Sequence, residues 1–101
     1  MEIKLANTGD LLPGKMIDVS YLGQSILLAN LKGKYYAIGN RCTHLGCLLS
    51  KGILKGAKVH CPCYGSIFDI RTGEVLTGPA KDPEPIFKLK IDGDKIMLVT
   101  Q

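Results

Sequence analysis

All four cysteines of the chain fall between positions 42 and 63, in two short groups. The first group reads CTHLGC from Cys42, and the second reads CPCYGS from Cys61. A disulfide scaffold normally spreads its cysteines along the chain to link distant loops, so this clustering favours a metal site. We therefore expect the chain to fold so that the two groups form loops around one metal centre.

The residue types in these groups suit a soft metal centre. Cysteine thiolate binds iron–sulfur clusters, zinc and copper(I), and the neutral imidazole of His44 suits iron or zinc. Gly46 and Gly65 let the backbone approach an inorganic core and leave amides to donate to its sulfurs. Pro62 stiffens the second loop. Two loops that each open with a cysteine and each carry a glycine predict a metal site far better than a lone Cys-x-His would.

The rest of the chain consists of short apolar stretches with turn signals about every 8 to 12 residues, which predicts an all-β sandwich or barrel. A three-residue loop of Lys32, Gly33 and Lys34 is expected to join two strands of a hairpin. Phe87, Leu89 and Ile91 alternate with polar residues, which predicts one half-buried strand. No segment keeps a helical period over three turns. The other strands are expected at 2–6, 15–20, 25–31, 35–38, 57–60, 66–70 and 95–99.

Length and composition set the class of protein. A chain of 101 residues is one domain's worth, so a single domain over 1–101 is expected. Its 46% apolar and 22% charged residues are ordinary for a folded protein. Its longest apolar runs have about four residues, too few for a membrane span. The first residues lack a signal-peptide layout, so a soluble, cytoplasmic protein is expected.

The net charge is +4, without a run of basic residues. Nucleic-acid binding asks for a clustered basic patch with aromatic residues, so no nucleic-acid partner is expected. The lysines fit solvated strand edges and turns, and they would also steer the chain toward an acidic redox partner.

The two cysteine groups, followed by Phe68 and Asp69, resemble a Rieske iron–sulfur domain. Thr72 and Gly73 are similar to the turn that follows in this family, and residues 78–80 are similar to its proline loop over the cluster. The resemblance runs from about residue 5 to residue 99. It implies a Rieske-like antiparallel β sandwich or barrel, with a small cluster-binding subdomain at about 40–80 and base strands from both flanks.

The family binds a [2Fe–2S] cluster, with two cysteines on one iron and two histidines on the other. The resemblance places Cys42 and Cys61 on the first iron and His44 on the second. It puts Tyr64 where the second histidine is expected. It also implies a soluble one-electron carrier, similar to a Rieske-type ferredoxin and not an enzyme, which works as a monomer with a reductase or an oxygenase.

Tyr64 leaves several interpretations open. Its phenolate could bind iron, or the cluster could take a water, hydroxide or buffer ligand at that position. Cys63 could replace it as a thiolate, or the cluster could be lost in favour of zinc or a single iron. The tyrosine could also be engineered, or could simply pack over the loop. His60 precedes Cys61 in a strand, so its side chain is expected to point away from the cluster.

The resemblance implies further roles around the cluster. Cys47 and Cys63 would form a disulfide between the loops, with two free thiols as the alternative in a reducing compartment. Ser66 would donate to a bridging sulfide, and Phe68 lacks the hydroxyl of the tyrosine found in high-potential members, which leaves it as a core aromatic. The residues expected to line the cluster are Gly46, Gly65, Ser66 and Pro79.

A module without redox activity is the competing function. Such a module would be vestigial, or filled with zinc or a single iron, and would act as a subunit or an engineered metal-site scaffold. Its absorption spectrum would distinguish it, because an iron–sulfur protein is brown-red and a zinc protein is colourless. A catalytic oxygenase is not expected, because 101 residues leave no room for its second, mononuclear-iron domain.

Overall fold

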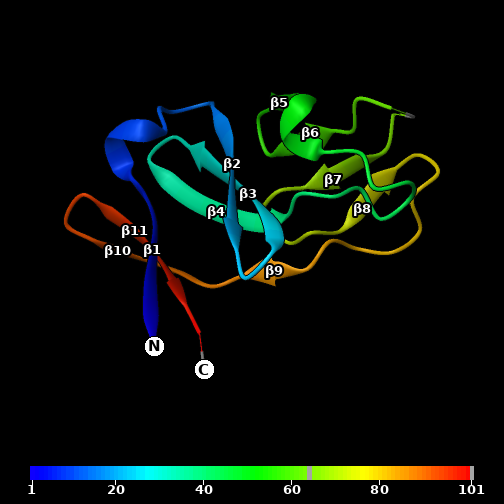
Figure 1. Cartoon of the computed structure of the whole chain (residues 1–101). Coiled ribbons are helices and arrows are strands. Elements are labelled where there is room, and N and C mark those ends of the chain that lie inside the picture. The colour runs from blue at the N-terminus through cyan, green and yellow to red at the C-terminus, as the bar shows by residue number, and fades with distance from the viewer. Residues whose placement is uncertain (64, 101) are drawn as a thin grey trace.

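The computed structural model describes residues 1–63 and 65–100, which form strands joined by loops and two short 3-10 turns (Figure 1). The turns are η1 (Thr8–Asp10) and η2 (Leu49–Lys51). The strands are β1 (Glu2–Asn7), β2 (Met16–Tyr21), β3 (Gln24–Leu31), β4 (Lys34–Gly39), β5 (Ile53–Lys55), β6 (Lys58–His60), β7 (Ile67–Asp69), β8 (Val75–Thr77), β9 (Ile86–Phe87), β10 (Leu89–Asp92) and β11 (Lys95–Val99). Neither turn, nor any other described helix, is long and apolar enough to cross a membrane.

The strands pair into three antiparallel sheets, with the orders β1-β11-β10, β2-β3-β4-β9 and β5-β6-β7-β8. Figure 1 shows the β5–β8 sheet at the end of the molecule away from the two termini. The sheets confirm the expected all-β, antiparallel architecture. They also place both cysteine loops at the same end, next to the β5–β8 sheet.

Strand β3 lies in the middle layer, because it is buried on both faces. Ile26, Leu27, Leu28 and Ala29 are all 0% exposed. Successive side chains of a strand point to opposite faces, so an uninterrupted apolar run fits a strand that is covered on both sides. Ile26 and Leu28 face one core, and Leu27 and Ala29 face another.

We call the core that Ile26 and Leu28 face the base core, and the core that Leu27 and Ala29 face the loop-side core. The base core packs the middle sheet against the β1-β11-β10 sheet, and it consists of Leu11, Ile26, Leu28, Ala37, Ile96 and Leu98. The loop-side core packs the middle sheet against the β5–β8 sheet, and it consists of Leu27, Ala29, Ile38, Cys42, Leu49, Val59, Cys61, Phe68, Ile70 and Ala80. Because Cys42 and Cys61 belong to the loop-side core, the candidate metal site continues a hydrophobic core.

The hairpin between β3 and β4 differs from the prediction. Leu31 pairs with Lys34, so its loop has two residues, Lys32 and Gly33, and not three. Both have positive φ, 53° and 92°. A two-residue turn of this kind matches the right-handed twist of the flanking strands, which favours it over a longer loop.

The single strand expected across Phe87, Leu89 and Ile91 is two strands. β9 pairs with β4 in the middle sheet, while β10 pairs with β11 in the neighbouring sheet. Phe87 and Leu89 nevertheless pack against the same base core. Phe87 and Leu89 keep the alternation, because the chain crosses from one sheet to the other without changing which side chains face the base core. Ile91 departs from it, since its side chain is 43% exposed.

Candidate metal centre

The two cysteine loops close in the same way. The amide of Cys42 donates to the carbonyl of Cys47 at 2.7 Å, and the amide of Cys61 donates to the carbonyl of Ser66 at 2.8 Å. The glycine before each closing residue, Gly46 or Gly65, has φ near the left-handed region, at 80° and 78°. Glycine adopts this conformation without the penalty of a Cβ, which explains its presence at the same place in both loops.

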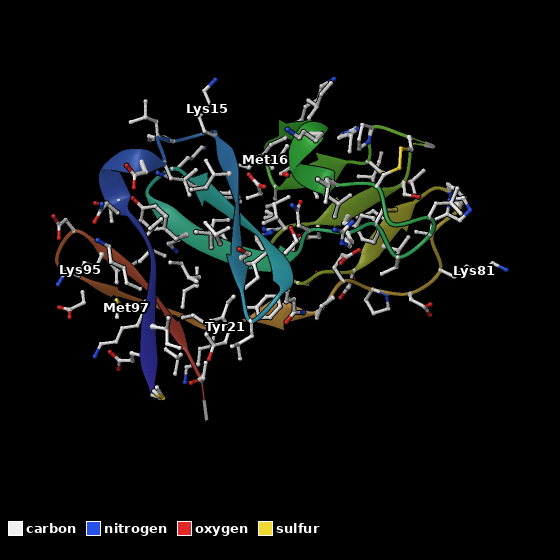
Figure 2. The ribbon with its side chains drawn as sticks, viewed as in Figure 1. Lys15, Met16, Tyr21, Lys81, Lys95 and Met97 are labelled. Atoms are coloured by element: carbon white, nitrogen blue, oxygen red, sulfur yellow. A yellow bond between two sulfur atoms is a disulfide. The ribbon has the colours of Figure 1, made fainter. Side chains whose placement is uncertain are left out.

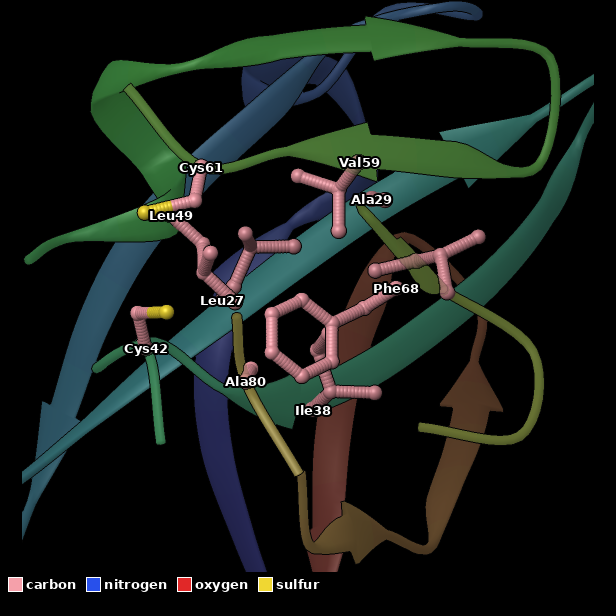
Figure 3. Close-up of a cluster of buried hydrophobic side chains, with 10 residues drawn as sticks. Leu27, Ala29, Ile38, Cys42, Leu49, Val59, Cys61, Phe68 and Ala80 are labelled. Carbon is pink, nitrogen blue, oxygen red and sulfur yellow. The ribbon is translucent and has the colours of Figure 1, made fainter. Parts of the chain in front are cut away.

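Cys42 and Cys61 meet at the edge of the loop-side core. They are 3% and 6% exposed, and Figure 3 shows both side chains at one side of the cluster of apolar groups. Burial raises the pKa of the Cys42 thiol, and its neighbour Cys61 raises that pKa further. The backbone amides of His44 and Leu45 act in the opposite direction. Both amides thus favour the thiolate that a metal needs.

The structure confirms the disulfide between Cys47 and Cys63, drawn in yellow in Figure 2. Its Cα atoms are 6.4 Å apart, and sixteen positions separate the two residues in the sequence. The bond ties the first loop to the second beside the thiol pair. Because its sulfur is bonded to Cys47, Cys63 does not offer the thiolate that one interpretation of position 64 required.

His44 is exposed, two residues beyond the buried Cys42. Among residues 1–63 and 65–100, no three His, Cys, Asp or Glu side chains gather closely enough to hold one ion. A two-iron cluster asks instead for two pairs of ligands, one on each iron. A buried thiol pair beside an exposed imidazole fits that donor set. The predicted fourth position, Tyr64, lies outside the described residues.

Ser66 is fully buried, and its Oγ accepts a hydrogen bond from the amide of Ala80 at 3.1 Å. A hydroxyl that accepts one bond keeps its own hydrogen for another acceptor. Gly78 packs directly on the second loop, since a Cβ at Gly78 would lie 2.5 Å from Ser66 Cα. Pro79, which lies between Gly78 and Ala80 in the sequence, is exposed. The segment that the sequence analysis assigned to cover the cluster therefore contacts the second loop.

Two further predictions concern neighbouring side chains. Phe68 is fully buried in the loop-side core, as expected for a core aromatic. His60 lines an outer groove of the β5–β8 sheet with Lys58 and Asp69, while its neighbour Val59 points into the loop-side core. His60 thus points away from the thiol pair, as its position in the strand predicted.

The sequence analysis missed Thr43 and Glu84. The Thr43 hydroxyl donates to the carbonyl of Asp82 at 2.6 Å. Glu84 is 4% exposed, and burial raises the pKa of its carboxyl to about 7, although the Thr43 amide acts to lower it. A glutamate between Pro83 and Pro85 in a polar loop gives no sequence signal of burial.

Comparison with known proteins identifies the family. The model of the Rieske [2Fe–2S] domain matches residues 1–98. The ferredoxin component of biphenyl 2,3-dioxygenase from Rhodococcus jostii (strain RHA1) is 33% identical over 95 residues, which cover 94% of this chain and 89% of that protein. Apoptosis-inducing factor 3 of Mus musculus is 33% identical over 98 residues. This match covers 97% of the chain but only 16% of the mouse protein, so the chain spans a small part of that relative.

Solved structures show the same fold. The ferredoxin of carbazole 1,9a-dioxygenase from Nocardioides aromaticivorans IC177 superposes with a TM-score of 0.94 at 24% identity, over 100% of this chain and 99% of that one. A chain in the complex of reduced oxygenase and oxidized ferredoxin in carbazole 1,9a-dioxygenase gives a TM-score of 0.91 at 26% identity, over 96% and 91% of the two chains. The family model covers almost the whole sequence, and the chain therefore belongs to the Rieske [2Fe–2S] domain family.

Proposed function

We propose that the chain is a one-electron carrier that holds its [2Fe–2S] cluster between loops 42–47 and 61–66. The observation that carries this proposal is the pair of buried thiols, Cys42 and Cys61, presented by two loops with the same closure. When bound, a [2Fe–2S] cluster accepts and releases single electrons. Relatives that are named as ferredoxin components of dioxygenases support the same function.

The proposed ligands divide between an inner and an outer side. Cys42 and Cys61 would hold the iron next to the loop-side core, and His44 would hold the outer iron with Tyr64 at the fourth position. The core excludes water from the cysteine side, which strengthens the hydrogen bonds that reach the sulfurs there. His44 is exposed, so electrons would enter and leave at its side of the site.

The proposed partners are a reductase that supplies electrons and an oxygenase that consumes them. The names of the relatives support this assignment, and one similar structure is a complex of an oxygenase with its ferredoxin. The net charge of +4 would favour an acidic docking surface on either partner. We also propose that the chain works in the cytoplasm, which cell fractionation would test.

Iron and sulfide analysis, with absorption and EPR spectra, tests the proposed function. We expect two irons and two sulfides per chain and an EPR signal only after reduction. Cys42→Ala and Cys61→Ala should each abolish the cluster, because each removes a buried thiolate. His60→Ala is the matched control, since His60 faces the outer groove, and it should keep the cluster. A colourless wild-type protein after reconstitution with iron and sulfide would overturn the proposal.

Partner exchange is tested separately with the reductase and oxygenase components of a biphenyl dioxygenase system. We expect the reductase to reduce the chain and the oxygenase to reoxidise it, with both rates falling as salt screens the positive charge. Failure with both partners would contradict the proposed partners while leaving the cluster assignment in place.

A further inference from the structure

Asn40 is a buried polar residue directly after β4, two positions before Cys42, and it is 0% exposed. Its Nδ2 donates to the Oγ of Ser25 at 2.9 Å, and its Oδ1 accepts from the amide of Ser50 at 2.8 Å. Ser25 belongs to β3 and Ser50 to η2, fifteen and ten positions away in the sequence. A buried amide is costly unless it is bonded, and here both of its polar atoms are bonded. The side chain of Asn40 therefore joins β3 and η2 at the entrance to the first cysteine loop.

The backbone of Asn40 lies at the base of a short ladder that ends in the first cysteine loop. Three successive backbone pairs form this ladder: Asn40 with Leu49, Arg41 with Leu48, and Cys42 with Cys47. The Asn40 amide also donates to the Ser25 carbonyl at 3.1 Å, which attaches the base of the ladder to β3. The bond from Asn40 Oδ1 to Ser50 adds a side-chain link just beyond these three pairs. Asn40 thus holds both limbs of the loop that carries Cys42 and His44.

The other end of η2 packs against the second cysteine loop. A Cβ on Gly52, which follows η2, would overlap the backbone carbonyl of His60, and His60 directly precedes Cys61. Leu49, the first residue of η2, is buried in the loop-side core with Cys42 and Cys61 (Figure 3). η2 therefore lies between the two cysteine loops, bonded to Asn40 on one side and packed before Cys61 on the other.

We propose that Asn40 is a positioning residue, which bonds η2 to β3 and thereby sets where Cys42 and His44 lie relative to Cys61. This inference rests on the proposed function. Metal ligands must be held close to their binding geometry by the residues that surround them. The side chain of Asn40 bonds to Ser25 and Ser50, neither of which is a proposed ligand, so Asn40 acts through the backbone of the first loop.

A second buried asparagine provides a matched control. Asn30, near the opposite end of β3, is 2% exposed. Its Nδ2 donates to the Leu11 carbonyl at 2.9 Å, and its Oδ1 accepts from the Gly33 amide at 2.8 Å. Asn40→Leu and Asn30→Leu therefore remove the same kinds of bond from two buried sites, and both should destabilise the fold. Only Asn40→Leu should alter the cluster.

A milder pair of variants tests the same link if Asn40→Leu does not fold. Ser25→Ala removes the oxygen that accepts from Asn40 Nδ2, at a half-buried position, and leaves the bond to Ser50 in place. Ser25→Thr keeps a hydroxyl at that position and is the conservative partner. The two variants differ in the bond to Asn40 and not in any proposed ligand.

The experiment measures the EPR g-values, the reduction potential and the rate of cluster loss to a chelator in each holoprotein. We expect Asn40→Leu to change the g-values and the potential and to release the cluster about tenfold faster, a factor that one unpaired buried amide can account for. Ser25→Ala should change all three in the same direction by less. Asn30→Leu and Ser25→Thr should stay near the wild type.

Two results would overturn the inference. One is an Asn40→Leu protein, or a Ser25→Ala protein where the leucine variant does not fold, whose g-values, potential and release rate all match the wild type. The other is an Asn30→Leu protein that is as altered in all three as Asn40→Leu, since a general loss of stability would then explain both. A wild-type chain that holds no [2Fe–2S] cluster would instead refute the proposed function, so the two failures are distinguishable.

Discussion

In the proposed site, position 64 is the fourth ligand position, on the outer iron. The family pattern calls for a histidine there, and this chain has Tyr64. A phenolate, or a hydroxide in its place, adds a negative charge that a neutral imidazole does not add. Extra negative charge disfavours the reduced cluster, so the wild-type potential should lie below that of relatives with two histidines.

Tyr64→His should raise the reduction potential and add a second imidazole step to its dependence on pH. The reason is the exchange of an anionic ligand for a neutral one that titrates. Protein-film voltammetry between pH 5 and 10 measures both effects, with Tyr35→His as a control for an added histidine far from the cysteine loops. Equal potentials for the wild type and Tyr64→His would show that position 64 does not bind iron.

Glu84 should make stability depend on pH in an unusual direction. Its pKa is raised from 4.5 to about 7 in the folded chain, chiefly by burial. Between these values the folded chain keeps a proton that the unfolded chain releases. The free energy of unfolding therefore falls as the pH rises from about 4.5 to 7, by at most about 1.4 kcal/mol per pH unit, and levels off above 7.

Denaturant titrations at pH 5, 6, 7 and 8 check this dependence on Glu84. In Glu84→Gln the fall between pH 5 and 7 should be smaller than in the wild type, because the amide does not titrate. Glu74→Gln is the control, because Glu74 is an exposed glutamate in the turn between β7 and β8. Parallel slopes for the wild type and Glu84→Gln would refute the raised pKa.

The Cys47–Cys63 disulfide joins the two loops at the scale of elements. It closes a loop of about 15 residues, for which the chain-entropy model gives a stabilisation of about 3 kcal/mol. The Cys47→Ser/Cys63→Ser double variant should therefore unfold at lower denaturant concentration and release its cluster faster. A reductant should have the same effect on the wild type and no effect on the double variant. Identical denaturation curves for the wild type and the double variant would contradict this role.

The strands that the sequence predicted are those with local signals. The β-branched residues in β2 and the apolar run in β3 are such signals, as is Gly93 in the turn before β11. β5 and β8, of three residues each, went unpredicted, whereas the equally short β6 and β7 were predicted because they flank the second cysteine group. The split between β9 and β10 was also missed, because it depends on which neighbouring strand is available and not on the residues themselves.

The candidate site likewise contains residues that the sequence indicates and a residue that it does not. Cys42, His44 and Cys61 could be proposed as ligands because their chemistry is rare and their spacing is local, and the structure brings Cys42 and Cys61 together. The burial of Glu84, which raises the pKa of its carboxyl, could not be predicted, since it depends on Gly39 and Gly73, which are distant in sequence. A long-range niche of this kind becomes visible only when the fold brings the three residues together.

At the scale of the molecule, the metal centre and one of the two cores are a single structure. Cys42 and Cys61 belong to the loop-side core, whereas the base core contains no proposed ligand. The middle sheet separates the two cores, because β3 sends alternate side chains to each. Bound cluster should thus stabilise the loop-side core directly and the base core only through the shared sheet.

Removal of the cluster should therefore loosen the molecule unevenly. Amides of β6 and β7, and of the two cysteine loops, should lose most of their protection from hydrogen exchange, because the loop-side core would lose the proposed bonds from Cys42 and Cys61 to the metal. Amides of β10 and β11 should keep theirs, because the base core is untouched. Hydrogen exchange followed by mass spectrometry, on holoprotein and on chelator-treated protein, measures this difference, and Cys42→Ala should reproduce the chelated pattern. An even loss of protection across all three sheets would show instead that the cluster stabilises the two cores as one cooperative unit.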